Sequence, residues 1–187
     1  MIYTIDDFLT AKVLENLNKY LINFKEVDTI DKKFWVMDTI PDFEQWVENK
    51  ISKIEGKKIK SILSFFRIST DKLDTDWRIH CDSIINDQIP SRAIVLYLSD
   101  RGTNILNGTA FWQHKDYGNK LPYEELSTNT YNDLLLNESE NLDHWRLDTV
   151  VGYKKNRLVS YPSNYFHSKY PNKSWEEGRK VFVMFYK

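Results

Sequence analysis

Residues 77–82 have the sequence WRIHCD, and this stretch decides how the rest of the chain is interpreted. In an extended strand, side chains two residues apart point to the same face. His80 and Asp82 would then project into one space, while Ile79 and Cys81 would face the other way. An imidazole and a carboxylate on one face are two of the three ligands of a 2-His-1-carboxylate iron site. The spacing alone is common, so the remaining sequence must supply the third ligand and a suitable fold.

On both sides of this stretch, the hydrophobic pattern is that of strands. The run 91–99, SRAIVLYLS, is the clearest buried strand. Turn residues at 100–102, 107–108 and 155–156 separate further runs of alternating or apolar residues, at 62–68, 109–113, 149–153, 157–161 and 179–186. Residues 149–153 and 157–161 are expected to form a hairpin. Many short strands after a helical start predict a helix-backed β-sandwich or jelly roll.

Two helices are expected before these strands. Residues 4–7, TIDD, resemble a capping box, and apolar residues then recur at helical spacing as far as Ile22. A second helix is expected from Pro41 to about Ile54, because proline suits a first helical turn. A short strand is expected between them. We therefore expect one mainly β (α+β) domain over residues 1–187, with a helical support region at 1–56 and a double-stranded β-helix (jelly-roll) core at 57–187.

Composition excludes several classes of protein. The 187 residues carry a formal net charge of −1, so they lack the basic footprint of a nucleic-acid binder. No apolar run is long enough for a membrane span. Cys81 is the single cysteine, which excludes an internal disulfide, and we expect it to be a small core residue. The N-terminus lacks the pattern of a signal peptide, so a cytoplasmic protein is expected.

A distant histidine and an arginine complete a possible site. His167 lies between two expected strands, where a closed double-sheet fold can return it to the region of His80. Arg179 follows about a dozen residues later, at the start of the last strand. Alternation places Arg179 on one face with Val181 and Val183, and a buried guanidinium is costly unless it meets an anion. A cosubstrate carboxylate fits, because guanidinium binds it with two parallel hydrogen bonds.

The order of these residues resembles that of Fe(II)- and 2-oxoglutarate-dependent dioxygenases, and most closely the prolyl-4-hydroxylase-like branch. The opening IDDFL at 5–9 is similar to the start of that branch. The strand RAIVLYLS at 92–99 is similar to its strand after the metal pair, and NGTAF at 107–111 to its Gly-x-Thr-x-Phe segment. Only one of the family's paired glycines is present, as Gly108.

The resemblance implies a site and a reaction. His80, Asp82 and His167 would hold Fe(II), and Arg179 would bind the distal carboxylate of 2-oxoglutarate. The enzyme would use O2, release succinate and CO2, and hydroxylate a C–H bond. The family's tyrosine in the strand before the metal pair is missing here, so Tyr97 or Ser69 is the candidate for a second 2-oxoglutarate contact.

The substrate is not identified by the sequence. The family analogy suggests a prolyl or other peptidyl side chain, and a free amino acid, a small metabolite or a nucleic-acid base remains open, the base being disfavoured by the near-neutral charge. Residues 115–148 are long, polar and weakly periodic, which is typical of a lid, and they could contain a short helix at 131–136. Arg78, Trp112 and His114 are candidate substrate contacts. The acidic run 71–76 is interpreted as a solvated turn, because it lacks the pattern of a calcium loop.

Simpler interpretations exist for the same residues. His167 and His144 could be loop histidines, and Arg179 could pair with Glu176 or Glu177 at the surface. At the level of function, the alternatives are a jelly-roll metalloenzyme that does not use 2-oxoglutarate and a non-catalytic jelly-roll binding protein.

Overall fold

The computed structural model describes residues 1–28, 33–70, 72–74, 76–82, 84–99, 108–170 and 178–187. The described residues form ten strands, which are β1 Tyr3–Ile5, β2 Lys25–Asp28, β3 Lys33–Asp38, β4 Ser61–Ser69, β5 Arg92–Tyr97, β6 Gly108–His114, β7 Trp145–Val151, β8 Leu158–Pro162, β9 His167–Tyr170 and β10 Arg179–Tyr186. The helices are α1 Ala11–Tyr20, α2 Pro41–Glu55, the 3₁₀ turn η1 Tyr123–Ser127, α3 Asn129–Asp133, the π-helix η2 Leu134–Glu138 and the 3₁₀ turn η3 Leu142–His144.

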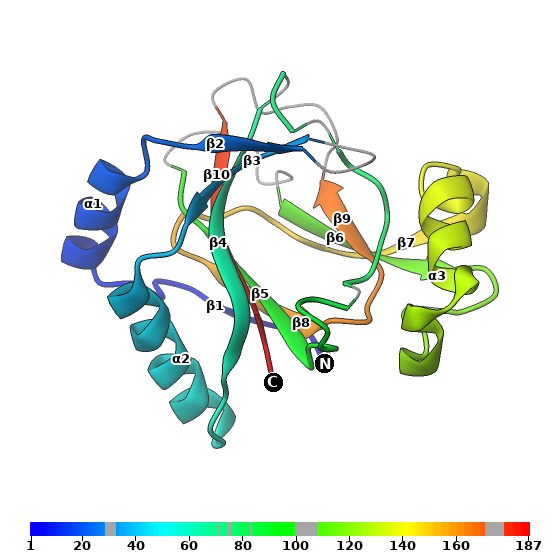
Figure 1. Ribbon diagram of the computed structural model, residues 1–187, viewed down its shortest axis with the longest axis horizontal. Helices are drawn as coiled ribbons and strands as arrows, with labels where there is room; N and C mark the ends of the chain where they lie inside the picture. Colours follow the sequence, from blue (N-terminus) through cyan, green and yellow to red (C-terminus); the bar gives the residue numbers. More distant parts are fainter. Residues whose placement is uncertain (29–32, 71, 75, 83, 100–107, 171–177) are drawn as a thin grey trace.

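The strands form two antiparallel sheets (Figure 1). The larger sheet has the order β1-β8-β5-β10-β4-β3-β2, and the smaller has the order β7-β6-β9. Helices α1 and α2 lie on one side of the larger sheet, and the smaller sheet lies on the other (Figure 1). This arrangement confirms the predicted mainly β, helix-backed jelly roll. Strands β1, β2 and β3 show that the first 56 residues also extend the larger sheet.

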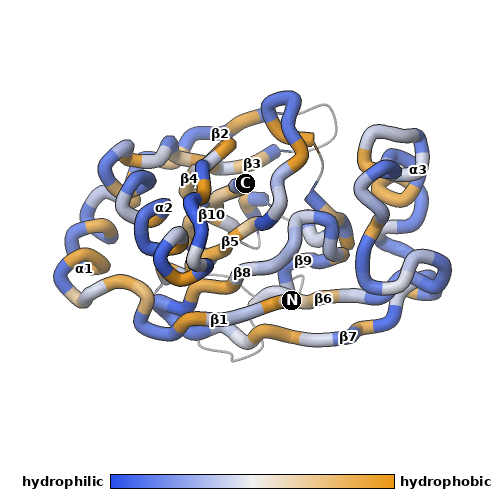
Figure 2. The backbone as a smooth tube through the Cα atoms, turned by 90° about the horizontal axis from the view of Figure 1, so that it is seen from below, coloured by the Kyte–Doolittle hydropathy of each residue, from blue (hydrophilic) through white to orange (hydrophobic). Residues whose placement is uncertain are grey.

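The central strands are apolar on both faces because each face is covered. In β5 and β10, one set of alternating residues packs under the helices, and it includes Ile94, Leu96, Phe182 and Met184. The intervening residues pack between the sheets, and they include Ala93, Val95, Val181 and Val183. Figure 2 shows hydrophobic residues concentrated along these strands, whereas α1 and α2 alternate between hydrophilic and hydrophobic residues. The apolar residues on both faces of these strands therefore reflect three packed layers, which are the helices, the larger sheet and the smaller sheet.

The first helix begins later than its sequence signal suggests. Residues 4–7 were expected to cap it, but Tyr3–Ile5 pairs with β8 as strand β1. The helix begins at Ala11, where the side chain of Thr10 accepts a hydrogen bond from the amide of Val13. Ile22 lies beyond the helix and is exposed, so it is not part of the buried stripe. The second helix, Pro41–Glu55, confirms its prediction, with Pro41 in the first turn.

The expected hairpin of residues 149–153 and 157–161 is wrong. Strand β7 pairs with β6 in the smaller sheet, and β8 pairs with β1 and β5 in the larger one. Asn156 turns the chain between the sheets with φ of 65°. Its side chain accepts a hydrogen bond from the amide of Leu9 and donates one to the carbonyl of Leu9. The connection therefore crosses the sandwich and anchors the N-terminal segment.

Residues 115–148 are more ordered than a lid loop. They contain η1, α3, η2 and η3, and their last residues belong to β7. The expected helix at 131–136 is confirmed in part by α3, which continues directly into the π-helix η2. Leu126, Leu134 and Trp145 pack with Ile79 and Cys81 in a core cluster on the outer side of the smaller sheet. Both views place this helical segment at the opposite end of the molecule from α1 and α2 (Figures 1 and 2).

Two expected turns, at 100–102 and at Asn107, lie outside the described residues. Among the helices that are described, none has the length and apolar character needed to cross a membrane.

Gly108 is the position where backbone approach is tightest. A Cβ at this residue would lie 1.8 Å from the carbonyl oxygen of Val151 on the neighbouring strand. We expect Gly108→Ala to lower the free energy of unfolding by about 1–3 kcal/mol, the usual cost of overpacking, as measured by urea denaturation. Thr149→Ala, on the exposed side of β7, is the control and should change it by less than about 0.5 kcal/mol. Equal stability of the two variants would contradict this packing argument.

Candidate metal centre

The segment that carries His80 and Asp82 is extended but joins the sheets through a single bridge. The amide of His80 donates to the carbonyl of His167 at 3.0 Å, and the amide of His167 donates to the carbonyl of His80 at 2.7 Å. The amide of Asp82 donates to the carbonyl of Ser163 at 2.8 Å. Ile79 and Cys81 face the opposite side and are 1% exposed. The predicted alternation is confirmed, and the two ligand-bearing segments are directly paired.

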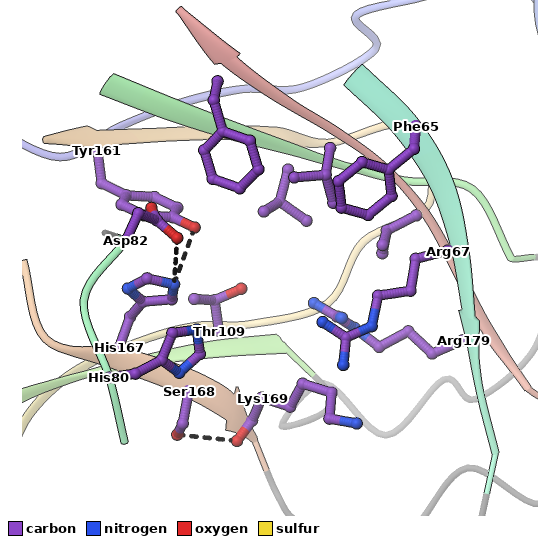
Figure 3. A pocket seen from close by; sticks show the side chains of 14 residues that line it. Phe65, Arg67, His80, Asp82, Thr109, Tyr161, His167, Ser168, Lys169 and Arg179 are labelled. Carbon is purple, nitrogen blue, oxygen red and sulfur yellow. Dashed lines mark hydrogen bonds and ion pairs between the residues drawn. The ribbon is translucent and has the colours of Figure 1, made fainter. Parts of the chain in front are cut away.

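Three side chains converge at this bridge. His80, Asp82 and His167 each offer a ligand atom, and these atoms all lie within 4.8 Å of one another. His167 Nε2 lies 3.8 Å from Asp82 Oδ1, and the two imidazole rings lie 4.5 Å apart. His167 and Asp82 are almost fully buried. Figure 3 shows the three side chains on one side of a shared pocket.

The hydrogen bonds of the two histidines decide which nitrogens face the pocket. His80 Nδ1 lies 2.8 Å from the carbonyl oxygen of Arg78, and His167 Nδ1 lies 2.9 Å from that of Tyr165. A carbonyl only accepts, so each Nδ1 carries the hydrogen and each Nε2 keeps its lone pair. The hydroxyl of Tyr161 lies 3.1 Å from His167 Nε2 and donates to it. The hydrogen bonds from the two Nδ1 nitrogens to backbone carbonyls are the usual support of metal-bound histidines, because they orient each ring with Nε2 toward the metal.

The burial and hydrogen bonding of the three side chains favour the binding of a cation. Burial raises the pKa of Asp82 well above its ordinary value. Burial, and then the charge of His80, lowers the pKa of His167 well below its ordinary value. Asp82 Oδ2 is buried and has no hydrogen-bond partner among the described residues. Two imidazole nitrogens and a desolvated carboxylate fit a divalent metal, and two histidines with one carboxylate are the ligand set of non-heme Fe(II).

The metal centre opens into a cavity of about 100 Å³. Arg179 lines its far side, and Val181, Val183 and Phe185 follow it on the same face of β10. Arg179 is 6% exposed, and burial lowers its pKa. Its Nη2 donates to the carbonyl of Gly108 at 3.5 Å. The expected pairing with Glu176 or Glu177 lies outside the described residues. Arg179 is thus a buried cation that faces the three metal-competent side chains.

Tyr97 and Ser69, the candidates for a second cosubstrate contact, do not line this cavity. The hydroxyl of Tyr97 hydrogen bonds to Thr109 Oγ1 at 2.8 Å, and its ring lies under the guanidinium of Arg179 at 5.1 Å. Ser69 donates to the carboxylate of Asp74. Tyr97 therefore supports the cavity wall from behind, whereas Thr109 lines the cavity itself, as do Tyr161 and Ser168. Sequence reasoning had matched Thr109 to a family segment without giving it a role.

A cluster centred on Asp74 was missed by sequence reasoning. Asp74 was expected in a solvated turn, but it is 4% exposed, and Arg67 donates to it from Nε and Nη2. Lys169 Nζ donates to its carbonyl at 2.6 Å and its carboxylate at 3.2 Å. Burial, and then the charge of Arg67, lowers the pKa of Lys169 to about 7. Lys169 stands two residues after His167, so strand alternation was a signal for its placement.

A second and larger cleft, of about 630 Å³, adjoins the first. Both are lined by His80, Arg67 and Lys169, and the larger cleft extends to Phe34 on β3 and to Arg78. Arg78 also forms an ion pair with Asp76 at 3.0 Å, so its role as a substrate contact stays a prediction.

Trp112 and His114 line neither cavity, so their predicted role at the substrate mouth is not supported by their position. Trp112 packs in the core cluster beyond the smaller sheet, and its Nε1 donates to Ser168 Oγ at 2.9 Å. His114 is buried against Trp145. Side chains on this outer face of the smaller sheet are covered by residues 121–145 and are therefore separated from the metal centre.

Comparison by sequence finds no match among protein-family models and none among curated proteins. Comparison by structure finds several similar folds. HygX from Streptomyces hygroscopicus, with nickel, 2-oxoglutarate and hygromycin B bound, has a TM-score of 0.62 at 12% identity, over 99% of this chain and 82% of HygX. A Pseudomonas putida prolyl-4-hydroxylase has a TM-score of 0.55 at 11% identity, over 100% of this chain and 91% of the hydroxylase.

A third similar structure is SnoN, a non-heme α-ketoglutarate-dependent epimerase from nogalamycin biosynthesis. It has a TM-score of 0.64 at 10% identity, over 99% of this chain and 77% of SnoN. At such low identity these likenesses establish the fold, which is the jelly roll shared by all three enzymes.

The metal centre itself is testable without any reaction. Mn²⁺ at 100 times its Kd should stabilise the folded chain by about 2.7 kcal/mol, which raises the melting temperature by about 5–10 °C for a domain of this size. Asp82→Asn should abolish this rise, because it removes the charged ligand. The variant should be at least as stable without metal, because a buried charge is gone.

Asp87→Asn, a matched change at an exposed position nearby, should keep the full metal-induced rise. Thermal unfolding with Mn²⁺ and with EDTA measures both variants. An undiminished rise in Asp82→Asn would rule out Asp82 as a metal ligand.

Proposed function

We propose that this chain is an Fe(II)- and 2-oxoglutarate-dependent oxygenase, with His80, Asp82 and His167 as the iron ligands. The observation that carries the proposal is the placement of these three side chains across a shared cavity from a buried arginine, Arg179. A divalent cation can bind the three side chains at one end of this cavity, and an anion can pair with Arg179 at the other. A keto acid with a second carboxylate has a chelating group for the metal and an anion for Arg179.

The similar structures support this proposal. HygX was determined with nickel and 2-oxoglutarate bound and, separately, with iron bound. SnoN was determined with Fe³⁺, α-ketoglutarate and nogalamycin RO. These enzymes share the jelly roll of this chain, which can therefore carry such a site.

Each residue has a definite task in this proposal. His80, Asp82 and His167 hold the iron and leave part of its coordination sphere open to the cavity. Bound iron supplies the activation of O2 and the oxidation of substrate, while 2-oxoglutarate is converted to succinate and CO2. Arg179 binds the distal carboxylate of the cosubstrate, where two parallel hydrogen bonds also fix its orientation. Val181 and Val183 exclude water from the space between.

Thr109 is our candidate for the second contact to 2-oxoglutarate. Its hydroxyl lines the cavity, and it is oriented by the hydrogen bond to Tyr97. Tyr97 in turn lies against the guanidinium of Arg179. The three side chains therefore form one unit, in which Thr109 and Arg179 contact the carboxylate and Tyr97 positions both.

The substrate would enter through the larger cleft. This cleft reaches His80 and carries aromatic and aliphatic walls, including Phe34, Phe65 and Phe185. It is roomy enough for a peptidyl side chain or a small metabolite. Hydroxylation is the outcome implied by the prolyl-4-hydroxylase resemblance, whereas the similar enzyme SnoN is described as an epimerase. A cytoplasmic location remains a prediction.

The reaction is tested by succinate formation. The metal-free chain is loaded anaerobically with Fe(II) and 2-oxoglutarate and then exposed to O2, and succinate is quantified. We expect slow substrate-free turnover in the wild type and none in Asp82→Ala. If the wild type forms no more succinate than this variant, with or without peptide and small-molecule extracts as substrate sources, then the chain does not have the proposed activity. Binding of metal without succinate would instead favour a non-catalytic binding protein.

A second variant separates 2-oxoglutarate dependence from metal binding. Arg179→Met keeps the apolar stem but removes the guanidinium, and it should weaken 2-oxoglutarate binding by about 10-fold to 100-fold, the value of a charge-assisted hydrogen bond. Its Mn²⁺ affinity should stay within about twofold of the wild type. Isothermal titration with 2-oxoglutarate in the presence of Mn²⁺ measures the change.

Lys180→Met is the matched control, because Lys180 points to the opposite face and donates to the carbonyl of Leu21. It should leave 2-oxoglutarate affinity unchanged. Unchanged affinity in Arg179→Met as well would favour a jelly-roll metalloenzyme that does not use 2-oxoglutarate.

A further inference from the structure

Two histidines and a glutamate form a second cluster, away from the proposed iron centre. The ligand atoms of His114, Glu138 and His144 all lie within 4.8 Å of one another. His114 Nε2 lies 2.8 Å from Glu138 Oε2, and His144 Nδ1 hydrogen bonds to the same oxygen. None of the three residues lines the cavities at the iron centre. The proposed oxygenase reaction leaves this cluster unexplained.

Three different elements bring the cluster together. His114 ends strand β6 and is 3% exposed. Glu138 is the last residue of the π-helix η2, a wide turn that is rare and is often found at functional sites. Its carbonyl accepts a hydrogen bond from Trp145 Nε1 at 2.8 Å. His144 closes the 3₁₀ turn η3 just before strand β7. The cluster therefore ties the helical segment 123–144 to the smaller sheet.

We propose that His114, Glu138 and His144 form a second metal site, which binds Zn²⁺ and fastens the helical segment to strand β6. Two imidazoles and one glutamate are a known zinc ligand set, and a water would occupy the fourth position. Glu138 and His144 are about a quarter exposed, so this water has access. For one ligand set, Zn²⁺ binds more tightly than Fe²⁺ or Mn²⁺.

The protonation states of the metal-free cluster set the cost of binding. His144 Nδ1 donates to the carboxylate of Glu138 in the metal-free cluster, so its hydrogen moves to Nε2 when Nδ1 coordinates with its lone pair. His114 Nδ1 accepts a hydrogen bond from the amide of Asp116 at 3.2 Å, so its Nε2 carries the hydrogen that Glu138 accepts. Coordination at Nε2 moves this hydrogen to Nδ1 and ends the bond from Asp116. Asp116 lies in an exposed turn, where water can take over its amide. The cost is this long hydrogen bond and the two hydrogen bonds that Glu138 accepts from the histidines, which the bonds to the metal replace.

The site would act on the iron centre through the backbone. Ser139 follows Glu138 directly, and its carbonyl accepts a hydrogen bond from the amide of Ile79 at 3.1 Å. Ile79 immediately precedes His80. A metal that holds Glu138 in place therefore also holds the segment that presents His80. The proposal of a second site does not depend on the proposed oxygenase reaction.

The test is the number of zinc ions bound by the full, metal-stripped chain. Zn²⁺ is titrated against the wild type, followed by desalting and elemental analysis. We expect two equivalents in the wild type and one in Asp82→Asn. Glu138→Gln and His144→Asn should each lose the zinc ion at the second site, with its affinity lowered more than about 100-fold. Residues that only hydrogen bond to metal ligands already contribute about 10-fold to 100-fold to affinity, so removing a ligand should cost more. Glu140→Gln, at an exposed neighbouring position, should keep both.

An amide shift adds a readout that does not depend on counting. Adding Zn²⁺ to the folded Asp82→Asn variant should shift the ¹H–¹⁵N resonance of Asp116, and the additional change Glu138→Gln should abolish this shift. Circular dichroism establishes that each variant is folded. The proposal is overturned if Asp82→Asn binds no zinc, or if the second equivalent persists in both Glu138→Gln and His144→Asn. Either result would make the cluster a metal-free hydrogen-bond network.

Discussion

The reciprocal backbone hydrogen bonds between His80 and His167 are the constraint on which the candidate iron centre depends. His167 begins a strand of the smaller sheet, whereas His80 lies in a segment with no strand of its own among the described residues. The amides of Ile79 and Asp82 also donate to the carbonyls of Ser139 and Ser163, but only the bridge pairs the two histidine-bearing segments directly. The bridge also explains the symmetry of the two imidazoles, since each is oriented by the carbonyl two residues before it.

The same constraint shapes the electrostatics of the cavity. Once Asp82 is held in a buried position, its carboxylate carries a desolvation penalty that only a cation or a proton can relieve. At the opposite wall, burial imposes the reverse penalty on Arg179. A folded protein tolerates such buried charges when a bound ligand compensates them. Burial therefore disfavours a negative charge at one end of the cavity and a positive charge at the other, and under the proposed function a metal and a dicarboxylate would offset these two penalties.

Strand alternation predicted much of this site and little of its surroundings. It placed His80 with Asp82, and Arg179 with Val181, because these relations depend on local geometry alone. The pattern could not assign β7 and β8 to different sheets, since an apolar strand looks the same whichever neighbour it pairs with. It also missed Asp74, because an acid in a polar run is buried only through distant partners, here Arg67 and Lys169. The sheet assignment of β7 and β8 and the burial of Asp74 depend on contacts between residues far apart in the sequence, which local patterns do not show.

The two clusters of this chain show why ligand identity alone does not assign a reaction. His80, Asp82 and His167 have the same kinds of donor atoms as His114, Glu138 and His144. The first set faces a cavity with a buried arginine opposite, so a cosubstrate can reach the metal. In the second set, His114 packs against the rings of Tyr117 and Trp145, and none of the three residues lines either cavity at the iron centre. Chemistry follows from the space in front of the ligands, and the same three groups without that space are suited to holding a structure together.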